Sequence, residues 1–500
     1  MDILQHLTAG LSLLIQPLPL LMIVVGTIVG IVVGVIPGLT ATMAIAIAVP
    51  MTFVMDAMPG LALLIAVYVG GMTGGLVSAV LLRIPGTPAS IATCFDGYPM
   101  AARGEPGRAL GYGVFASFLG GGFSYIVLLT MAPMVAMQAV KLTYFDIFSI
   151  VMCAMVMIAD TSQGSLLKAL IAGFVGMLIG IVGPDPISGV ARLTFGWSEL
   201  SGGFAESSVL IGLFAMSQLL VEMHKVNARC PDFNVNYRNI IPKWRDLLES
   251  WGNLLRSSLI GTVIGIIPGV GASTASLIAY NQAKLASREP EKFGTGVKDG
   301  IIASEAANNA VTGGAMVPLL TLGLPGCPVA ALMLSGLIIK DLQPGPALFS
   351  NNPGIVYGFF LAFILANFVM FFMMIAFIKP FAMVLKVPKY LLIPPILSLC
   401  AFGAYISNNR MMDVWVLVAF GLVAYFAEKN GYSLGSLVLG VILGPIAELQ
   451  LRRGLSASDS FLPLLTSPIS AIFLAIALVI LALSLYHDWR RGRPIAPATS

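Results

Sequence analysis

Charged residues are scarce in this chain. Lys, Arg, Asp and Glu together make up 10% of the 500 residues, whereas a soluble globular domain carries about 25%. The formal net charge is only +4, which is too little for the dense basic surface that a nucleic-acid partner requires. Hydrophobic residues make up 58%, and the mean hydropathy is +0.93. The composition excludes a fully water-exposed surface and predicts an all-α polytopic membrane protein within a lipid bilayer.

Residues that bind metals or catalyse reactions are also few. The five cysteines are scattered without a Cys-x-x-Cys pair, and the three histidines lie far apart, so we expect neither a metal site nor a disulfide framework. The GxxxxGK[ST] nucleotide-binding loop is missing, and no nucleophile–base set or carboxylate pair stands within an apolar segment. We therefore expect no cofactor and no enzymatic activity. Uphill movement of a solute would need an ion gradient or a partner.

Long apolar segments recur along the whole chain. A bilayer core about 30 Å thick needs roughly 20 apolar residues per helical crossing, and the polar stretch 222–256 is too short for a catalytic domain. We expect about 11–12 transmembrane helices, plus segments around Pro37 and Pro268 that are either re-entrant or broken single crossings. Eleven full crossings are predicted at residues 60–83, 109–134, 144–159, 166–183, 203–221, 301–322, 354–378, 390–406, 412–427, 433–447 and 463–486.

The chain contains an internal repeat. Residues 30–42 align with residues 261–273 at one constant offset, with a Pro-Gly pair at the same place in both. Further on, Thr-Gly-Gly followed by a second Pro-Gly pair occurs at 73–88 and again at 312–328. Because two blocks recur in the same order, we infer that the two halves of the chain are related.

Loop charges indicate that the two halves have opposite orientations. The loop 83–108 has three Arg, whereas its counterpart 324–353 has only Lys340. The loop 136–146 has one Lys, and its counterpart 379–389 has three. Because basic loops stay in the cytoplasm, these reversals predict an inverted-topology repeat, a common plan of secondary transporters. The predicted parts are a first repeat at 1–222, a cytoplasmic connector at 223–254, a second repeat at 255–486 and a basic cytoplasmic tail at 487–500.

Four Pro-Gly pairs interrupt the apolar segments. Such pairs end helices and leave backbone groups unpaired, which a membrane interior tolerates only around a wet cavity or within protein. Small polar residues follow each pair, and a helix that starts there points its positive end at one spot, which suits a carboxylate. The alternative is that the pairs only kink helices for packing. The predicted substrate-binding residues are Pro37, Gly38, Thr40, Thr42, Pro85, Gly86, Thr87, Ser90, Gly269, Ser273, Thr274, Asn308, Asn309, Thr312, Gly326 and Cys327.

Polar residues also occur inside the predicted crossing 301–322. Glu305, Asn309 and Thr312 share one helix face, and polar groups inside a membrane usually face a functional cavity. We therefore predict that Glu305, Asn309 and Thr73 hold a coupling ion, either Na⁺ or H⁺. The alternative for Glu305 is a hydrated position near the cytoplasmic end. Arg83 either attracts an anionic substrate or anchors a helix end, and the glycine run 26–34 is predicted to pack closely against another helix.

The long run 84–113 carries Asp-Gly-Tyr-Pro at 96–99 and closely resembles the signature of the large membrane subunit of the tripartite tricarboxylate transporters. Residues 36–42 and 305–328 are similar to that family as well, and the resemblance covers essentially the whole chain. It implies a bacterial inner-membrane permease that works with a small membrane subunit and a periplasmic solute-binding protein. It also implies cation-coupled import of citrate-like carboxylates. Another organic anion, or an ion channel or exchanger without a binding protein, remains an alternative.

Cys327 stands where the first half has Thr87. If this tip lines an anion site, the thiol is reachable from solvent, and a nearby helix N-terminus favours its thiolate form. If the tip is a packing kink, the same thiol is buried and inert. The cysteine therefore distinguishes two interpretations of the Pro-Gly pairs.

Overall fold

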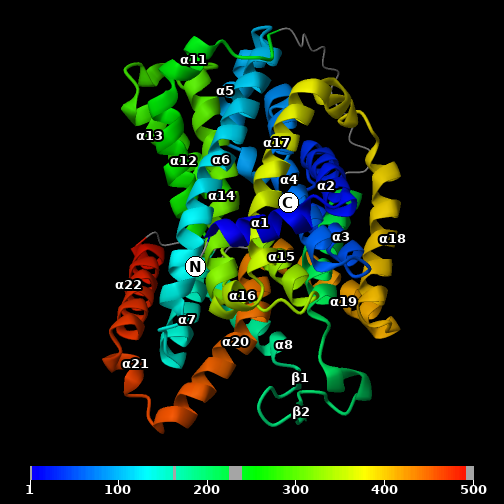
Figure 1. Ribbon diagram of the computed structural model, residues 1–500, viewed down its shortest axis with the longest axis vertical. Coiled ribbons are helices and arrows are strands. Elements are labelled where there is room, and N and C mark those ends of the chain that lie inside the picture. Colours follow the sequence, from blue (N-terminus) through cyan, green and yellow to red (C-terminus); the bar gives the residue numbers. More distant parts are fainter. Residues whose placement is uncertain (1–2, 162–164, 225–238, 491–500) are drawn as a thin grey trace. The chain divides into compact units, whose positions relative to one another are not determined.

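The computed structural model describes residues 3–161, 165–224 and 239–490. Helices account for most of these residues, and ten of the described helices are long and apolar enough to cross a membrane. The β structure within the described ranges is a short antiparallel hairpin formed by β1 (Gly183–Pro184) and β2 (Ala191–Arg192) (Figure 1). The predicted all-α polytopic membrane class is confirmed. Residues 225–238 of the predicted connector and 491–500 of the predicted tail lie outside the described residues.

The helices of the first half of the chain are separated by short connections. They are α1 (Ile3–Leu14), α2 (Pro17–Val35), α3 (Ala41–Thr52), α4 (Ala57–Leu82), η1 (Pro88–Ser90), α5 (Thr93–Ala102), α6 (Pro106–Ala139), α7 (Tyr144–Thr161), α8 (Leu166–Gly180), η2 (Ser198–Gly202), α9 (Glu206–Ile211), η3 (Gly212–Met216) and α10 (Ser217–Met223).

The second half follows a similar order of long and short helices. They are α11 (Trp244–Glu249), α12 (Trp251–Ile266), α13 (Gly271–Ala286), η4 (Pro290–Lys292), α14 (Lys298–Leu322), α15 (Pro328–Ile338), α16 (Pro346–Asn351), α17 (Pro353–Val384), α18 (Lys389–Asn408), α19 (Met411–Lys429), α20 (Leu434–Ser458), α21 (Pro463–Thr466) and α22 (Pro468–Arg490).

Several predicted boundaries differ from the structure. Helix α2 is 19 residues long and is a candidate crossing in its own right, although the segment was not counted among the full crossings. The predicted crossing 166–183 is only the 15-residue helix α8, because the chain enters the β1–β2 hairpin at Gly183. The predicted loops 83–108 and 324–353 contain the short helices α5 and α15, each of which follows a Pro-Gly pair.

The chain packs as two compact units, and each unit contains segments from both halves of the sequence. The predicted repeats are therefore not the packing units. Unit 1 comprises Met1–Ala136, Glu222–Ile267 and Gly271–Ser398, and unit 2 comprises Met137–Val221, Pro268–Val270 and Leu399–Ser500.

Within unit 1, two helix pairs pack in the same way. Helix α2 packs along α4, and α12 packs along α14. A Cβ added to Gly34 would lie 3.1 Å from the Gly74 Cα, and a Cβ added to Gly265 would lie 3.0 Å from the Gly314 Cα. Backbones this close leave no room for a larger residue, which confirms the predicted packing role of the glycine run 26–34. The matching contacts also support the proposed relation between the halves.

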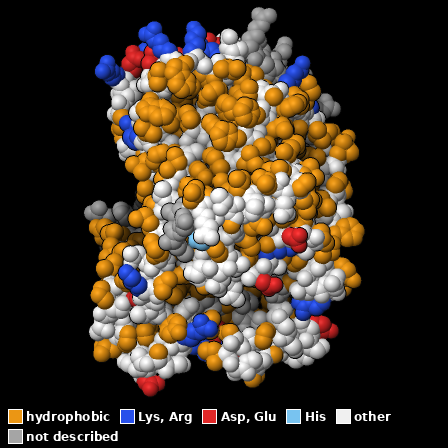
Figure 2. Space-filling view, in the orientation of Figure 1, with side chains coloured by type: hydrophobic (Ala, Val, Ile, Leu, Met, Phe, Trp, Pro, Cys, Tyr) orange, Lys and Arg blue, Asp and Glu red, His pale blue; other side chains and the backbone are white. Residues whose placement is uncertain are grey.

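Large apolar side chains cover much of the outer surface. Figure 2 shows hydrophobic side chains spread over the visible face, with Lys and Arg gathered in the region of α11 and α13. Large apolar residues on long helices, such as Phe372 on α17, are exposed. This distribution is typical of a protein whose solvent is lipid.

Candidate functional site

Helix α14 is a polar helix at the centre of unit 1. It is buried along its length from Gly300 to Thr321, although its polar residues keep it out of the set of strongly apolar spans. Glu305 and Asn308 are fully buried, and Asn309 is 2% exposed. Buried polar groups of this kind need hydrogen-bonding partners, and the neighbouring helices supply them.

Glu305 is held by hydroxyl groups from two neighbouring helices. Its Oε1 accepts a hydrogen bond of 2.6 Å from Thr93 on α5, and its Oε2 accepts one of 3.0 Å from Ser117 on α6. The Ser304 hydroxyl lies 2.9 Å from the Thr93 hydroxyl and widens this group of oxygen atoms. Glu305 is 0% exposed, so the alternative of a hydrated carboxylate near the cytoplasmic end is wrong.

Asn309 connects the same helix to the first half of the chain. The Thr73 hydroxyl on α4 donates a 2.9 Å hydrogen bond to the Asn309 Oδ1. The Asn309 Nδ2 donates in turn to the Asn308 Oδ1, at 2.5 Å, and to the Glu305 backbone carbonyl, at 3.2 Å. Asn308 Nδ2 lies 3.5 Å from the carbonyl of Ala89 in η1. The three predicted coupling residues therefore lie in one buried polar network.

Thr312 continues this polar face one turn further along α14. It is 1% exposed, and its hydroxyl oxygen has no hydrogen-bond partner within the described residues. An unpaired hydroxyl at this depth is uncommon in folded proteins. The predicted common face of Glu305, Asn309 and Thr312 is thus polar and buried throughout.

The Pro-Gly pairs at 85–86 and 325–326 each precede a short helix in unit 1. After the first pair, the hydroxyls of Thr87 and Ser90 lie 3.3 Å apart and are buried. After the second pair, Cys327 is the N-cap of α15, and its Sγ lies 3.6 Å from the Tyr68 hydroxyl on α4. Both tips are therefore packed against helices, with Gly86 and Gly326 buried among them.

The expectation that the Cys327 thiol is reachable from solvent is wrong for this structure. Cys327 is 5% exposed, and the neighbouring Tyr68 is 1% exposed. The thiol is buried because α15 packs against α3 and α4. The N-terminus of α15 is thus closed off from water in the conformation described here.

The other two pairs, at 37–38 and 268–269, connect longer helices. Gly38 has φ +94° and Gly269 has φ +90°, values that glycine adopts without strain. Thr40 is the N-cap of α3, and its hydroxyl accepts a 3.2 Å hydrogen bond from the Met43 N–H. Helices α12 and α13 lie side by side (Figure 1). The chain thus turns back after the second of these pairs, which favours a re-entrant segment over one broken crossing.

The predicted site residues near these two pairs are more open than the network on α14. They are half-buried, so water-sized molecules reach part of their surface. These residues are Pro37, Gly38, Thr40, Thr42, Gly269, Ser273 and Thr274, and Pro85 of the pair 85–86 is half-buried as well.

Two contacts within unit 1 join segments that follow Pro-Gly pairs of opposite halves. The turn η1, which follows the pair 85–86, packs against α13, which follows the pair 268–269. Helix α15, which follows the pair 325–326, packs against α3, which follows the pair 37–38. In each contact, a segment that follows a Pro-Gly pair of one half packs against a helix that follows a Pro-Gly pair of the other half. This packing brings together, within unit 1, helices that carry predicted site residues.

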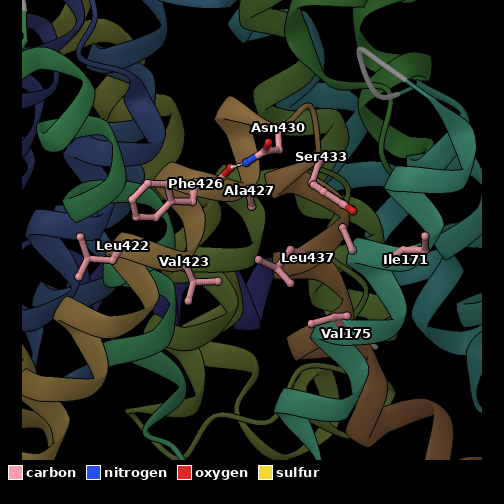
Figure 3. A pocket seen from close by; sticks show the side chains of 11 residues that line it. Ile171, Val175, Leu422, Val423, Phe426, Ala427, Asn430, Ser433 and Leu437 are labelled. Carbon is pink, nitrogen blue, oxygen red and sulfur yellow. Dashed lines mark hydrogen bonds between the residues drawn. The ribbon is translucent and has the colours of Figure 1, made fainter. Parts of the chain in front are cut away.

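A separate cavity of about 540 Å³ lies in unit 2. Figure 3 shows its lining from α8, α19 and the start of α20. Its walls are mostly apolar side chains such as Ile171, Val175 and Phe426, and none of the predicted site residues line it. The side chains that line it include no cationic group that could bind a carboxylate, so we do not assign the substrate to this cavity.

Asp96 was missed by the sequence reasoning. Its Oδ1 accepts hydrogen bonds from the backbone N–H groups of Gly294 (3.0 Å), Gly296 (2.7 Å) and Val297 (2.8 Å), and its Oδ2 accepts one of 2.9 Å from the Tyr280 hydroxyl. The carboxylate thus fixes the loop that leads into α14. Only its place within the run 84–113 could have pointed to it. Thr93 and Ser117 were missed because single hydroxyls in apolar helices are common.

The connector is anchored to the helices of unit 1 through Asp246 on α11. Its Oδ2 accepts a 2.6 Å hydrogen bond from the Tyr112 hydroxyl. That hydrogen bond lowers the pKa of Asp246 below its usual value, and the positive charges of Lys298 and Arg108 lower it further. The carboxylate therefore remains ionised at neutral pH and holds the start of α14 through the Lys298 ammonium, 3.9 Å away.

The sequence is similar to a known family and to known proteins. Residues 20–439 match the Tripartite tricarboxylate transporter TctA family. An Agrobacterium vitis protein described as an uncharacterized 52.8 kDa protein in the TAR-I ttuC' 3' region is 31% identical over 99% of this chain and 98% of its own length. A second Agrobacterium vitis protein, described as an uncharacterized protein in the TAR-II ttuC' 3' region, is 32% identical over 47% of this chain and 97% of its own length.

No solved structure matches this chain. The family match covers the four Pro-Gly pairs, α14 with its buried polar network, and the run around Asp96. The resemblance found in the sequence is thus confirmed over the segments that carry it. The chain belongs to the tripartite tricarboxylate transporter TctA family.

Proposed function

We propose that this chain is a secondary active permease that imports small carboxylates by alternating access coupled to a cation gradient. The observation that carries the proposal is the buried network on α14, in which Glu305 and Asn309 are joined to α4, α5 and α6 by hydroxyl groups. Costly polar groups at this depth are typical of a transport pathway.

The Pro-Gly pairs supply the features that suit an anionic substrate. Each pair is followed by a helix N-terminus with a small polar residue, and a helix N-terminus favours carboxylates through its free N–H groups and dipole. The reciprocal packing of η1 on α13 and of α15 on α3 gathers these ends in unit 1. Citrate-like tricarboxylates are the proposed substrates, and another organic anion is the alternative.

Glu305 is the proposed site of the coupling cation. Its carboxylate accepts hydrogen bonds from the hydroxyls of Thr93 and Ser117, and the Ser304 hydroxyl lies beside that of Thr93. No Lys or Arg forms an ion pair with Glu305 among the described residues. A carboxylate with hydroxyl oxygens around it can bind Na⁺ through oxygen ligands or carry a proton. We propose that the cation neutralises Glu305 during transport, with Thr73 and Asn309 completing the site.

The two halves are proposed to be inverted repeats that give alternating access to this site from the two sides of the membrane. Matching glycine contacts of Gly34 with Gly74 and of Gly265 with Gly314 support a common origin of the two helix pairs. The family points to a small membrane subunit and a periplasmic solute-binding protein as partners. The proposed location is the bacterial inner membrane, with the connector 223–254 and the tail 487–500 in the cytoplasm.

The proposal is tested by reconstituting the chain with its membrane partner in liposomes. The binding protein, loaded with radiolabelled citrate or another carboxylate, is then supplied inside or outside the liposomes. We expect uptake that requires an inward cation gradient and stops when the proton and sodium gradients are both collapsed. Uptake that survives this collapse would contradict coupling. Substrate current without the binding protein in electrical recordings would instead identify a channel.

A further inference from the structure

A buried carboxylate occupies the turn at the first Pro-Gly pair. Gly38 has φ +94°, and a Cβ at this position would collide with the side-chain carboxylate of Glu222, which lies directly against it. Glu222 is at the end of α10 and is 3% exposed. Gly38 lies two residues before Thr40, the N-cap of α3. An anionic group of the protein itself thus lies beside the helix N-terminus that we assign to substrate.

Lys389 neutralises this carboxylate. It is the first residue of α18, and its Nζ forms an ion pair with the Glu222 Oε2. The Lys389 side chain is 21% exposed, whereas that of Glu222 is 4% exposed. Water therefore reaches the ammonium, while the carboxylate is enclosed between it and the turn. Among the described residues, the ion pair of Lys389 with Glu222 is the one that contacts a Pro-Gly turn, at Gly38.

The residues around this pair are partly exposed. Pro37, Gly38, Thr40 and Thr42 are half-buried, in contrast to the closed tip at Cys327. A cation beside a helix N-terminus is a strong site for an anion. The resident Glu222 carboxylate has the same chemistry as one carboxylate of the proposed substrate.

We propose that Lys389 is a binding residue for a substrate carboxylate and that Glu222 is an internal carboxylate which occupies its place when substrate is absent. This inference rests on the proposed function. A substrate carboxylate that pairs with Lys389 displaces Glu222 and separates the end of α10 from the start of α18. Substrate binding is thereby linked to a change in the contact between these two helices.

A purely structural ion pair gives a different pattern. If the pair only holds α10 to α18, then removing either charge leaves its buried partner uncompensated, which is strongly destabilising. Both substitutions would then impair the protein in the same direction, and exchanging the two charges would restore it. If Glu222 competes with substrate, the two substitutions have opposite effects on affinity.

The test measures citrate binding to the purified, detergent-solubilised chain by titration calorimetry, and citrate uptake in liposomes. We expect Lys389→Gln to weaken binding at least about tenfold, the loss of one charge-assisted hydrogen bond. We expect Glu222→Gln to tighten binding several-fold, because the internal competitor is gone. Lys389→Arg keeps the charge and retains most of the affinity. Lys292→Gln, in an exposed pair with Glu289, is the matched control and leaves affinity unchanged.

Each result decides between the two readings. Equal losses of affinity in both variants, with rescue by Glu222→Lys combined with Lys389→Glu, would overturn the inference. Wild-type protein that binds none of a panel of mono-, di- and tricarboxylates would overturn it as well. Opposite shifts in affinity without gradient-driven uptake would support the inference and contradict the proposed coupled transport. Uptake with no shift of affinity in either variant would agree with the proposed function but would refute the displacement of Glu222 from Lys389 by substrate.

Discussion

The Thr73 hydroxyl on α4 donates a 2.9 Å hydrogen bond to the Asn309 Oδ1 on α14, across 236 positions of sequence. Both side chains are buried. This contact joins one helix from each half of the chain at the centre of unit 1. Leaving a buried partner of such a bond unpaired costs about 1–3 kcal/mol, so the two helices are held in this register as long as the network is intact.

Asn309→Leu is expected to abolish uptake while expression and membrane insertion persist. Leucine fills a similar volume but supplies neither the acceptor for Thr73 nor the donor for Asn308. Radiolabelled uptake in vesicles measures the effect, and an immunoblot measures the amount of protein in the membrane. Thr321→Val is the control, because the Thr321 hydroxyl bonds only within its own helix, to the Val317 carbonyl. Normal uptake by Asn309→Leu would assign Asn309 to packing.

Glu305→Gln is expected to uncouple transport from the cation gradient. The amide keeps the shape of the side chain and can still accept a hydrogen bond from Thr93, but it can neither bind a cation by charge nor release a proton. Accumulation against a gradient should fall at least about tenfold, while exchange of internal for external substrate continues. Glu289→Gln on an exposed loop is the control. Gradient-driven accumulation at the wild-type level would remove Glu305 from coupling.

The sequence predicted the helical class and the polar face of α14 because both depend on local patterns. Glu305, Asn309 and Thr312 are spaced four and three residues apart, which places them on one face of a helix whether or not that helix is buried. Asp96, Thr93 and Glu222 could not be assigned from the sequence, since their roles depend on which distant segment packs against them. The division into two units was not predictable either, because it results from packing between the halves.

The interpretation of Cys327 shows the same limit. The sequence placed a thiol at a helix N-terminus after a Pro-Gly pair, and that pattern is the same whether the tip is open or closed. The structure buries the thiol against Tyr68. Only the packing of α15 on α3 and α4 decides its exposure.

Cys327 is therefore expected to resist a charged maleimide in the resting protein and to react during turnover. The other cysteines are replaced by Ser or Ala, and labelling is followed by mass spectrometry with and without substrate and gradient. Burial on the Tyr68 hydroxyl protects the thiol in the conformation described here, and a second conformation that opens the tip exposes it. Rapid labelling without substrate would show that the tip is open at rest.

Gly34→Val and Gly265→Val are expected to damage the protein to a similar extent. The two glycines occupy matching positions, where an added Cβ would lie 2.5 Å from the Gly71 carbonyl oxygen or 2.7 Å from the Val311 carbonyl oxygen. Such contacts force the helices apart, and overpacking of this kind typically costs about 1–3 kcal/mol. Thermal unfolding in detergent measures the loss. Gly252→Val is the control, because no atom of the described residues lies within 4 Å of a Cβ at that position.

Asp246 gives a prediction for pH. The Tyr112 hydroxyl and nearby positive charges lower its pKa in the folded protein, so its stabilising effect is present above the pKa of the unfolded chain, about 3.9. That effect is lost as pH falls through the lower pKa of the folded state. Asp246→Asn should therefore lower the thermal unfolding midpoint by the same amount at pH 7 and pH 5, and the difference should shrink only below about pH 4.

Tyr112→Phe tests the assigned cause of this pKa shift. It removes the 2.6 Å hydrogen bond to Asp246 and the 3.0 Å hydrogen bond that Arg108 donates to the same hydroxyl, while the charges of Arg108 and Lys298 remain. Because that hydrogen bond is the largest contribution, the variant should reproduce most of the loss seen in Asp246→Asn, and the double variant should add little. A difference between wild type and Asp246→Asn that shrinks between pH 7 and pH 6 would show that another group titrates in this contact. The anchoring of the connector would then depend on that group and not on the Asp246 carboxylate.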